Sequence, residues 1–235
     1  MNLVLLFPDD FVEDNRVVLR GRRREHIAHV HRAGAGDSLV VGLIDGKAGS
    51  GTITRLTPDE VELVVSLDGE PPPALPVTLI VALPRPKVLN RIVAGATSLG
   101  VKKIFLVNSW RVEKSYWKSP RLSVENLREQ ATAGLEQARD TVMPKIELRR
   151  LFRPFVEEEL PGIAAGTTAL VAHPRAAAEC PRDLEGAITL AIGPEGGFID
   201  LEIASLERAG FRAVSLGPRI LRVETAVAAL IARLV

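Results

Sequence analysis

The chain has 235 residues, of which 46% are hydrophobic and 25% are charged, so it can build a sizeable core in one large domain or two smaller ones. Its single cysteine, Cys180, excludes the class of small secreted folds held by internal disulfides. No uncharged apolar stretch, such as residues 226–232, is long enough to span a bilayer, and the N-terminus lacks the basic start and small-residue cleavage site of a signal peptide. We therefore expect a cytoplasmic protein with no membrane partner.

Although the formal net charge is only +1, positive charge gathers in two places. Six arginines lie between Arg16 and Arg32, opposed only by Glu25, and ten lysines and arginines lie between Arg85 and Arg128. Two basic patches on a nearly neutral protein favour the binding of a polyanion on one face. Solvated surface patches that bind nothing have the same composition, so charge alone leaves both interpretations open.

A proline-rich segment divides the chain. Residues 71–76, PPPALP, have few backbone donors and suit a stiff, extended connector. Short alternating runs rich in β-branched residues, as expected for strands, precede it at 38–44, 51–56 and 60–67. We therefore predict a small β-barrel over residues 1–70, with a short helix at about 22–31 that carries the first basic patch.

After this linker, residues 77–235 alternate between strand-like and helix-like patterns, which predicts an α/β domain with a mostly parallel sheet and flanking helices. Apolar runs typical of strands covered on both faces occur at 77–83, 103–107, 170–172, 188–192 and 213–216. Helical patterns occupy 88–99, 123–140, 201–209 and 224–235. Asp200 and Gly210 are the predicted start and stop signals of the third of these helices.

The last predicted helix carries one charged residue beyond its first turn, Arg233. A helix that is apolar all round has to be buried on all sides. Because this helix stands at the end of the chain, we expect it to form a subunit interface, and hence a homodimer.

The glycine-rich segment GPEGGF, residues 193–198, lies between a predicted buried strand and a predicted helix. Glycines at such a junction let a ligand approach the backbone closely, and a helix N-terminus offers unpaired amides. The segment is not a P-loop, because no Lys-Ser/Thr pair follows it, nor is it a Gly-x-Gly-x-x-Gly dinucleotide turn. It is either a ligand-binding loop or an ordinary tight connection.

A second segment, LGPRILRVETA at residues 216–226, gathers Arg219, Arg222 and Glu224 between a short strand and the last helix. Glu224 and Thr225 would open that helix, where an anion and a hydroxyl satisfy its first amides. The arginines are harder to explain by folding alone, because a buried segment seldom tolerates unpaired charges.

Together, these two motifs resemble the ribosomal RNA uracil-N(3)-methyltransferase family of the SPOUT class. The segment RREHIAHVHRAGAGD at residues 23–37 is similar to the N-terminal arm of that family, and the pair Glu136-Gln137 and Pro144 also match. The similarity spans essentially the whole chain. The two C-terminal motifs are specific when they occur together.

The resemblance implies a PUA-like barrel joined to a C-terminal domain that is tied in a deep trefoil knot, and it implies a homodimer. It also implies that the knot loops bind S-adenosylmethionine and that the substrate is a uridine near the 3′ end of 16S ribosomal RNA, either free or in the small ribosomal subunit. The cofactor-binding residues that it implies are His173, Gly193, Pro194, Glu195, Gly196, Gly197, Leu216, Gly217, Ile220, Leu221, Thr225 and Ala226. The basic patches would then contact RNA through Arg22, Arg23, Arg24, Arg32, Arg111 and Lys114.

The chemistry of the expected reaction requires particular residue types. N(3) of uracil becomes a good nucleophile only when its proton leaves, so an arginine beside the ring and a carboxylate that accepts the proton would both help. We choose Arg222 and Glu224 for these catalytic roles, with Arg219 next and Glu195 as the competing carboxylate. Beyond this, methyl transfer needs mainly the alignment of nitrogen, carbon and sulfur.

Aromatic residues accompany the second basic tract. Trp110, Tyr116 and Trp117 lie among its cations, an arrangement that suits stacking on unpaired bases, although packing onto their own domain is the more frequent role of such residues. The histidines near residue 30 lack Cys or acidic partners at ligand spacing, so no metal site is expected. Two other functions stay open: a related enzyme that acts on another RNA, such as transfer RNA, and a non-catalytic RNA-binding protein.

Overall fold

The computed structural model describes residues 2–235 and divides the chain into two compact units. One unit comprises the chain up to Pro73 together with Thr132–Met143, and the other comprises Ala74–Ala131 and Pro144–Val235. The division after Pro73 falls inside the proline-rich segment that the sequence analysis interprets as a linker. The segment Thr132–Met143 lies far along the chain from the rest of its unit, and the sequence pattern did not indicate this association.

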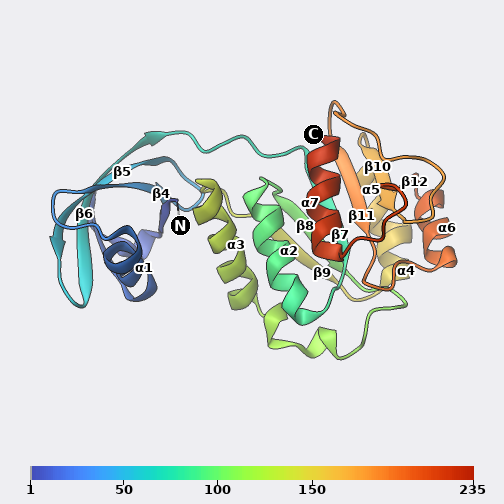
Figure 1. The fold of residues 1–235 in the computed structure, drawn as a ribbon, viewed down its shortest axis with the longest axis horizontal. Coiled ribbons are helices and arrows are strands. Elements are labelled where there is room, and N and C mark those ends of the chain that lie inside the picture. The colour runs from blue at the N-terminus through green and yellow to red at the C-terminus, as the bar shows by residue number, and fades with distance from the viewer. Residues whose placement is uncertain (1) are drawn as a thin grey trace. The chain divides into compact units, whose positions relative to one another are not determined.

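The first unit is built on a six-stranded sheet in the order β1-β4-β5-β6-β3-β2, of which Figure 1 labels β4, β5 and β6. Only β1 runs parallel to its neighbour, and the other pairs are antiparallel. The strands are β1 (Val4–Leu6), β2 (Phe11–Glu13), β3 (Arg16–Arg20), β4 (Ser38–Leu43), β5 (Ala48–Leu56) and β6 (Glu60–Gly69), and a short 3₁₀ turn covers Pro8–Asp10. The predicted helix is present as α1 (Gly21–His26) and a π-helical turn (Ile27–His31), and Ile27 is buried in the core of the sheet.

Alternate residues at the start of the chain face two different sides, as the two-residue period of a strand requires. Val4 and Leu6 lie in the core of the sheet, whereas Leu3 and Leu5 pack against Leu135. Leu135 belongs to α3 (Val124–Ala138), a helix that begins in the second unit and ends in the first. This apolar contact explains why the end of α3 belongs with the N-terminal sheet.

The second unit contains six parallel strands in the order β12-β10-β11-β7-β8-β9. They are β7 (Val77–Ala82), β8 (Lys103–Val107), β9 (Lys145–Arg149), β10 (Thr168–Ala172), β11 (Ile188–Ile192) and β12 (Arg212–Val214). The predicted α/β class with a mostly parallel sheet is therefore confirmed. The trefoil knot stays a prediction. Because all six strands run in one direction, their C-terminal ends share one edge of the sheet, the edge at which ligands bind in open α/β sheets.

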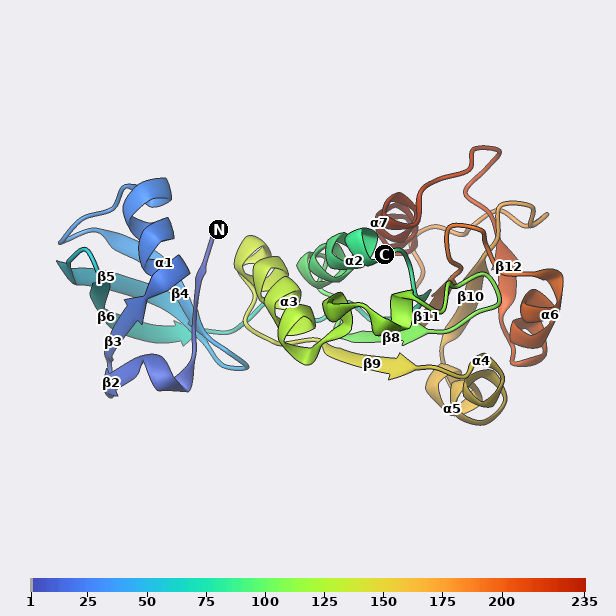
Figure 2. The same ribbon diagram turned by 90° about the horizontal axis from the view of Figure 1, so that it is seen from below.

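Helices cover both faces of this sheet. Figure 2 shows α2 and α7 on one face and α4 and α5 on the other. The helices are α2 (Pro86–Ser98), α4 (Phe152–Pro154), α5 (Leu160–Ala164), α6 (Asp200–Arg208) and α7 (Val223–Leu234), with short 3₁₀ turns at Tyr116–Lys118 and Pro120–Leu122 and a π-helical turn at Phe155–Glu159. No helix among residues 2–235 is both long and apolar enough to cross a membrane.

Helix α7 is not buried on all sides within the single chain. Five of its apolar residues are buried against its own domain: Val223, Val227, Leu230, Ile231 and Leu234. Thr225, Ala228 and Ala232 are exposed at successive turns and form one bare face of small side chains. The single chain therefore leaves this face of small residues uncovered, and its burial in a subunit interface stays a prediction.

The start of α6 also differs from the expectation. Asp200 is the first helical residue rather than the cap, and Ile199 occupies the N-cap position. The carboxylate of Glu202 accepts a hydrogen bond from the Ile199 backbone N–H at 3.0 Å, which satisfies one of the unpaired amides at this end of the helix. The sequence identified this end of the helix, but the N-cap lies one residue before the predicted one, at Ile199.

Candidate active site

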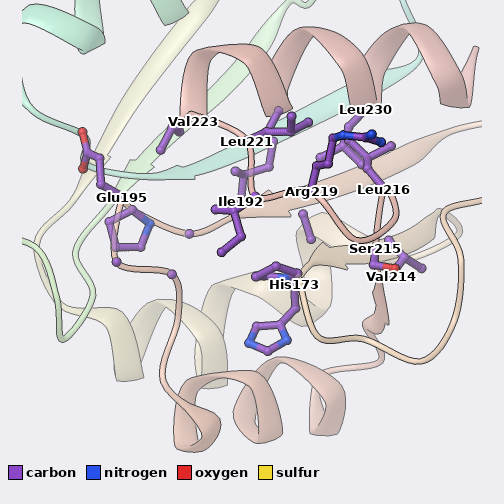
Figure 3. Close-up of a pocket in the computed structure, with 18 of the residues that line it drawn as sticks. His173, Ile192, Glu195, Val214, Ser215, Leu216, Arg219, Leu221, Val223 and Leu230 are labelled. Carbon is purple, nitrogen blue, oxygen red and sulfur yellow. The ribbon is translucent and has the colours of Figure 1, made fainter.

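A cavity of about 220 Å³ opens where three loops leave the C-terminal ends of β10, β11 and β12 (Figure 3). Strand β10 leads to His173, β11 leads to the glycine loop at 193–197, and β12 leads to the loop at 215–222. Helix α7 supplies a fourth side through Val223, Ala226 and Leu230. The cavity therefore forms at the edge where the parallel sheet presents its strand ends.

Most of the predicted cofactor-binding residues come together around this cavity. Those that line it are His173, Gly193, Pro194, Glu195, Gly196, Gly197, Leu216, Gly217, Ile220, Leu221 and Ala226. Thr225 is the exception, because it lies on the exposed face of α7 and is not part of the lining. The two motifs that are about twenty residues apart in the sequence thus face one another across a single cavity.

The glycine loop is folded too tightly for a side chain at its first position. A Cβ atom on Gly193 would lie 2.8 Å from the backbone N of Phe198 and 3.1 Å from the carbonyl carbon of Gly197. Gly197 has a φ of +72°, in the left-handed region that favours glycine, and its N–H donates to the Pro194 carbonyl at 2.8 Å. Glycine is therefore needed at both ends of this loop, and backbone rather than side chains forms this wall of the cavity.

Two residues from other elements hold the glycine loop in place. The Glu195 carboxylate accepts a hydrogen bond from the backbone N–H of Arg85 at 3.0 Å, at the start of α2. The Arg111 guanidinium, from the segment after β8, donates to the Gly196 carbonyl. The loop is thus fixed on two sides by contacts that do not use the cavity itself.

The loop that follows β12 exposes apolar side chains beside the cavity. Ile220 is 84% exposed and Leu221 is 38% exposed, although both are large and hydrophobic. Gly217 has a φ of +105°, which turns the chain sharply at the start of this loop. Exposed apolar groups of this size at the edge of a cavity are typical of a surface that a ligand covers.

The structure separates the predicted catalytic residues. Arg219 lines the cavity, whereas Arg222 occupies the N-cap position of α7 outside the lining. Glu224 lies in the first turn of α7, with its carboxylate 3.7 Å from the guanidinium of Arg91 on α2. The competing carboxylate, Glu195, is at the cavity. Which carboxylate accepts the proton stays an open prediction, and so do the roles of the arginines.

Several lining residues are not among the predicted cofactor-binding residues, including Ile192, Val214, Ser215 and Leu230. Ile192, Val214 and Ser215 are at or next to the last residues of β11 and β12, immediately before the loops that were identified. Leu230 lies four residues after Ala226 and therefore on the same face of α7. The strand ends and the helical period would have been sufficient signals for these four positions.

The basic helix of the first unit is attached to its own sheet through its arginines. The Arg23 guanidinium donates to the Asp10 carboxylate at 2.6 Å and to the Leu5 carbonyl at 2.9 Å. Arg24 donates to the Thr57 carbonyl at 2.7 Å. These bonds hold α1 on the sheet, so Arg23 and Arg24 have structural partners. Binding of RNA phosphates by these residues stays a prediction.

Arg22 makes a bidentate ion pair with Glu136, near the end of α3. Its guanidinium nitrogens lie 3.1 and 3.2 Å from the two oxygens of Glu136, whose side chain is only 3% exposed. The backbone carbonyl of Glu136 also accepts N–H bonds from Asn2 and Leu3 at 2.9 and 3.0 Å. Glu136, a residue of the family resemblance, therefore connects α3 to the basic helix and to the first strand.

Replacing Arg22 with alanine is expected to destabilise the first unit by about 1–3 kcal/mol, because the buried Glu136 carboxylate loses its partner. Urea unfolding of the full chain measures this change. Lys47→Ala removes a lysine from an ion pair whose two side chains are both more than half exposed, and it should change the stability by less than about 1 kcal/mol. Equal effects of the two variants would contradict a structural role of the Arg22–Glu136 pair.

The pKa of His26 makes the stability of the first unit dependent on pH. Burial of the ring lowers this pKa from 6.5, and the nearby charges of His31 and Arg22 lower it further. Below pH 6.5 the unfolded chain then binds more protons at His26 than the folded chain does, so we expect stability to fall as the pH drops through this range. In urea unfolding between pH 7.5 and 5, the His26→Gln variant should lose less stability than the wild type. An identical pH dependence in both proteins would contradict this prediction.

The remaining predicted RNA contacts have different surroundings. Arg32 is exposed, with a left-handed φ of 53° that ends the π-helical turn. Arg111 holds the glycine loop, as described above, and Lys114 lines a second cavity of the same unit. These three residues stay candidates for RNA binding.

The described part of the chain contains no group of three or more His, Cys, Asp or Glu residues that could hold a metal ion. Cys180 is buried, and burial raises the pKa of its thiol. A raised pKa keeps the sulfur protonated near neutral pH and makes it a poor nucleophile.

Comparison with known proteins shows the family to which the chain belongs. The family model for an RNA methyltransferase domain matches residues 70–235, and the model for an RNA methyltransferase PUA domain matches residues 19–66. The chain is 32% identical to ribosomal RNA small subunit methyltransferase E of Treponema pallidum, over 97% of this chain and 88% of that protein. It is 29% identical to the enzyme of the same name from Synechocystis, over 95% of this chain and 73% of that protein.

A solved structure is similar over nearly the whole chain. The crystal structure of ribosomal RNA small subunit methyltransferase E from Neisseria gonorrhoeae bound to S-adenosyl methionine superimposes with a TM-score of 0.76 and is 28% identical. The match covers 99% of this chain and 95% of that one. With the family models and the two relatives, this shows that the chain belongs to the ribosomal RNA small subunit methyltransferase E family.

Proposed function

We propose that the protein transfers the methyl group of S-adenosylmethionine to N(3) of a uridine near the 3′ end of 16S ribosomal RNA. The observation that carries this proposal is the cavity in which the glycine loop faces the loop at 215–222. The relative from Neisseria gonorrhoeae, which is similar over 99% of this chain, is bound to S-adenosyl methionine. Because ribosomal RNA is the substrate, we propose that the protein works in the cytoplasm.

The residues around the cavity fit a ligand of this kind. A Cβ on Gly197 would meet no atom within 4 Å, so the space beside this lining glycine is open and a ligand can approach the main chain closely. Ile220 and Leu221 offer apolar surface for a flat ring, while Ser215 and His173 offer polar atoms for hydroxyl or amino groups. S-adenosylmethionine, when bound, supplies a methyl group on a positively charged sulfur. The loops would hold and orient this donor.

The chain's own residues would prepare the uridine for attack. An arginine beside the ring stabilises the negative charge that develops as the N(3) proton leaves, and Arg222 and Arg219 are the residues proposed for this role. A carboxylate accepts the proton, and Glu224 and Glu195 are the two candidates. Glu195 is supported by its place in the cavity lining, and Glu224 by its place two residues after Arg222.

The experiment that tests this function compares ribosomal RNA from a strain lacking the protein with RNA from its parent. Mass-spectrometric mapping should show the loss of one N(3)-methyluridine near the 3′ end of the small-subunit RNA. Loss of a methylated nucleotide in transfer RNA instead would assign a different substrate. An unchanged map for all RNAs, together with no thermal stabilisation by S-adenosylmethionine, would identify a non-catalytic RNA-binding protein.

We also propose that the protein acts as a homodimer through α7. Its bare face of Thr225, Ala228 and Ala232 is adjacent to Glu224 and to the cavity, so a second subunit seated there would lie beside the site. Small side chains allow two helices to approach closely, and no charge on this face opposes the contact. The proposal explains why a terminal helix with so little polar surface is stable in water.

Replacing Ala228 with glutamate is expected to convert the dimer into a monomer, because two new charges would be buried at a symmetric contact. Sedimentation at micromolar concentration measures the change, and circular dichroism checks that the exposed substitution leaves the fold intact. Ala204→Glu is the matched control, because Ala204 is an exposed alanine on α6. A wild-type protein that sediments as a monomer would contradict the proposed dimer.

A further inference from the structure

A second and larger cavity, of about 950 Å³, lies in the same unit as the first. It opens at the C-terminal ends of β8 and β9, where β9 leads into α4 (Figure 2), and it extends to the first turns of α6. The continuous segment 193–202 lies between the two cavities and contributes to the lining of both. Gly193–Gly197 line the first cavity, and Ile199, Leu201 and Glu202 line the second.

An exposed tryptophan, Trp110, lines this second cavity, and a hydrogen bond holds its backbone in place. The Trp110 side chain is largely bare, with the residue 79% exposed, although indole is among the largest apolar groups of the chain. The backbone N–H of Trp110 donates to the buried carboxylate of Glu202 at 2.7 Å, so its position is set by the start of α6. A bare aromatic ring carried on a fixed backbone suits stacking on an unpaired base.

The second tryptophan of the cavity is already packed. The Trp117 indole N–H donates to Asn108 at 2.9 Å, and the Arg150 guanidinium lies over its ring at 5.4 Å from the centroid. This cation–π contact fixes the Arg150 charge at the wall of the cavity. Trp117 therefore serves the architecture of the site, and Trp110 is the ring that is available to a ligand.

The charges around this cavity favour an anion. Lys114, Arg150 and Arg208 line it, and none of them has an ion-pair partner among residues 2–235. Of the two carboxylates in the lining, Glu157 is paired with Arg153 at 2.9 Å, and Glu202 accepts backbone N–H bonds from Trp110 and Ile199. The free charge of the cavity is thus positive, which favours a phosphate backbone over an apolar protein surface.

An unsatisfied hydroxyl completes the site. Ser109 lines the cavity and is only 4% exposed, and its Oγ has no hydrogen-bond partner in the described part of the chain. A buried polar atom without a partner is costly, at about 1–3 kcal/mol, and such atoms in native proteins call for a specific explanation. Because this Oγ exposes almost no surface, a hydrogen bond with a bound nucleotide requires the Ser109 side chain to rotate toward the cavity.

We propose that the second cavity binds an unpaired nucleotide of the RNA substrate, distinct from the nucleotide that is methylated. Its base stacks on Trp110, its phosphates contact Lys114, Arg150 and Arg208, and Ser109 bonds to a polar atom of the nucleotide. The inference rests on the proposed function in that it takes RNA as the substrate. Because the glycine loop and the start of α6 form the wall between the cavities, a nucleotide held here would position the RNA beside the cofactor loops.

Tryptophan fluorescence tests this site directly, because both tryptophans of the chain, Trp110 and Trp117, line the cavity. The full-length protein is titrated with a single-stranded hexanucleotide of uridine, and we expect saturable quenching. In anisotropy measurements with the labelled hexanucleotide, Trp110→Ala should weaken binding roughly 5- to 150-fold, and Trp110→Phe should restore most of the affinity. Truncation of so exposed a side chain should leave the fold intact, which equal thermal midpoints would verify.

The two arginines of the cavity are tested through the salt dependence of binding. Replacing Arg150 and Arg208 with alanine should flatten the dependence of log affinity on log salt by roughly 0.7 for each RNA phosphate that the variant no longer neutralises. Arg182→Ala removes an exposed arginine outside both cavities and should leave the slope unchanged. An unchanged slope in the double variant would overturn the assignment of these two residues.

Other outcomes separate this inference from the proposed function. Unchanged RNA affinity in Trp110→Ala would overturn the nucleotide site, and a changed sedimentation mass in that variant would assign the surface to a protein contact instead. Binding of S-adenosylmethionine, measured by calorimetry, should be the same in Trp110→Ala and the wild type. A wild-type protein that binds the hexanucleotide through Trp110 but transfers no methyl group to ribosomal RNA would contradict the proposed function and leave the nucleotide site standing.

Discussion

Replacing Gly193 with alanine is expected to abolish detectable binding of S-adenosylmethionine and, with it, methyl transfer. The new Cβ would lie 2.8 Å from the Phe198 backbone nitrogen and 3.1 Å from the Gly197 carbonyl carbon. Both atoms belong to the main chain of the same loop, so no side chain can move aside and the loop itself has to shift. Because reactions of this kind depend on alignment, a shift of about 1 Å can cost on the order of 100-fold in rate.

Calorimetry with S-adenosylmethionine and single-turnover methylation of ribosomal RNA measure these two losses. Gly196→Ala is the matched control in the same loop. Its Cβ would lie 2.9 Å from Cδ of Arg111, a side-chain atom rather than main chain, so Arg111 can shift at the expense of its bond to the Gly196 carbonyl while the path of the loop is kept. This variant should keep most of its cofactor affinity. Wild-type affinity in Gly193→Ala would mean that the glycine loop is not the wall against which the cofactor binds.

The sequence indicates which loops surround this cavity because the constraints on those loops are local. Glycine is needed at 193 and 197 by the geometry of one short loop, so the motif contains the information for its own shape. The parallel strands that precede the loops are covered on both faces, so their sequences are continuous apolar runs. The two loops follow β11 and β12, which lie on either side of β10 in the sheet, so the strand order brings both loops to the cavity beside His173.

The sequence analysis missed a strand whose apolar pattern is hidden by charges and a contact whose partners lie far along the chain. Strand β9 was not predicted, because Lys145, Glu147 and Arg149 alternate with its apolar residues and form ion pairs at the edge of the sheet. Such charges keep an edge strand from pairing with other chains, but they hide the apolar pattern of a strand. Likewise, nothing near Leu135 indicates that it packs against Leu3 and Leu5.

The same reasoning explains why the sequence left two interpretations of the basic helix open. A run of three arginines indicates a phosphate-binding patch, because the sequence shows the positive charges but not the groups that pair with them. The structure gives Arg22 and Arg23 the carboxylates of Glu136 and Asp10, which are 114 and 13 residues away. Since the partner of Arg22 is so distant in sequence, charge clustering alone could not distinguish a surface for RNA from a set of internal ion pairs.

Arg222→Ala is expected to lower the turnover of ribosomal RNA by on the order of 100- to 1,000-fold, because removal of one charged stabiliser from a closed site has effects of this size. Binding of S-adenosylmethionine should fall much less, since Arg222 lies outside the lining of the cofactor cavity. Arg219→Ala should weaken both, because Arg219 is part of that lining. The exposed Arg182→Ala substitution is the control for loss of a positive charge. Near-normal turnover in Arg222→Ala would contradict the proposed role.

The two glutamine variants, Glu224→Gln and Glu195→Gln, decide which carboxylate accepts the N(3) proton. Glutamine keeps the shape of the side chain but cannot take up a proton, so the base variant should lose most turnover while still binding S-adenosylmethionine. The choice of Glu224 predicts the larger loss there, with Arg91→Ala as a control for the broken ion pair at 3.7 Å. Glu195→Gln keeps an oxygen that can accept the Arg85 N–H bond, so the glycine loop should stay in place. A larger loss in Glu195→Gln than in Glu224→Gln would transfer the role to the carboxylate that lines the cavity.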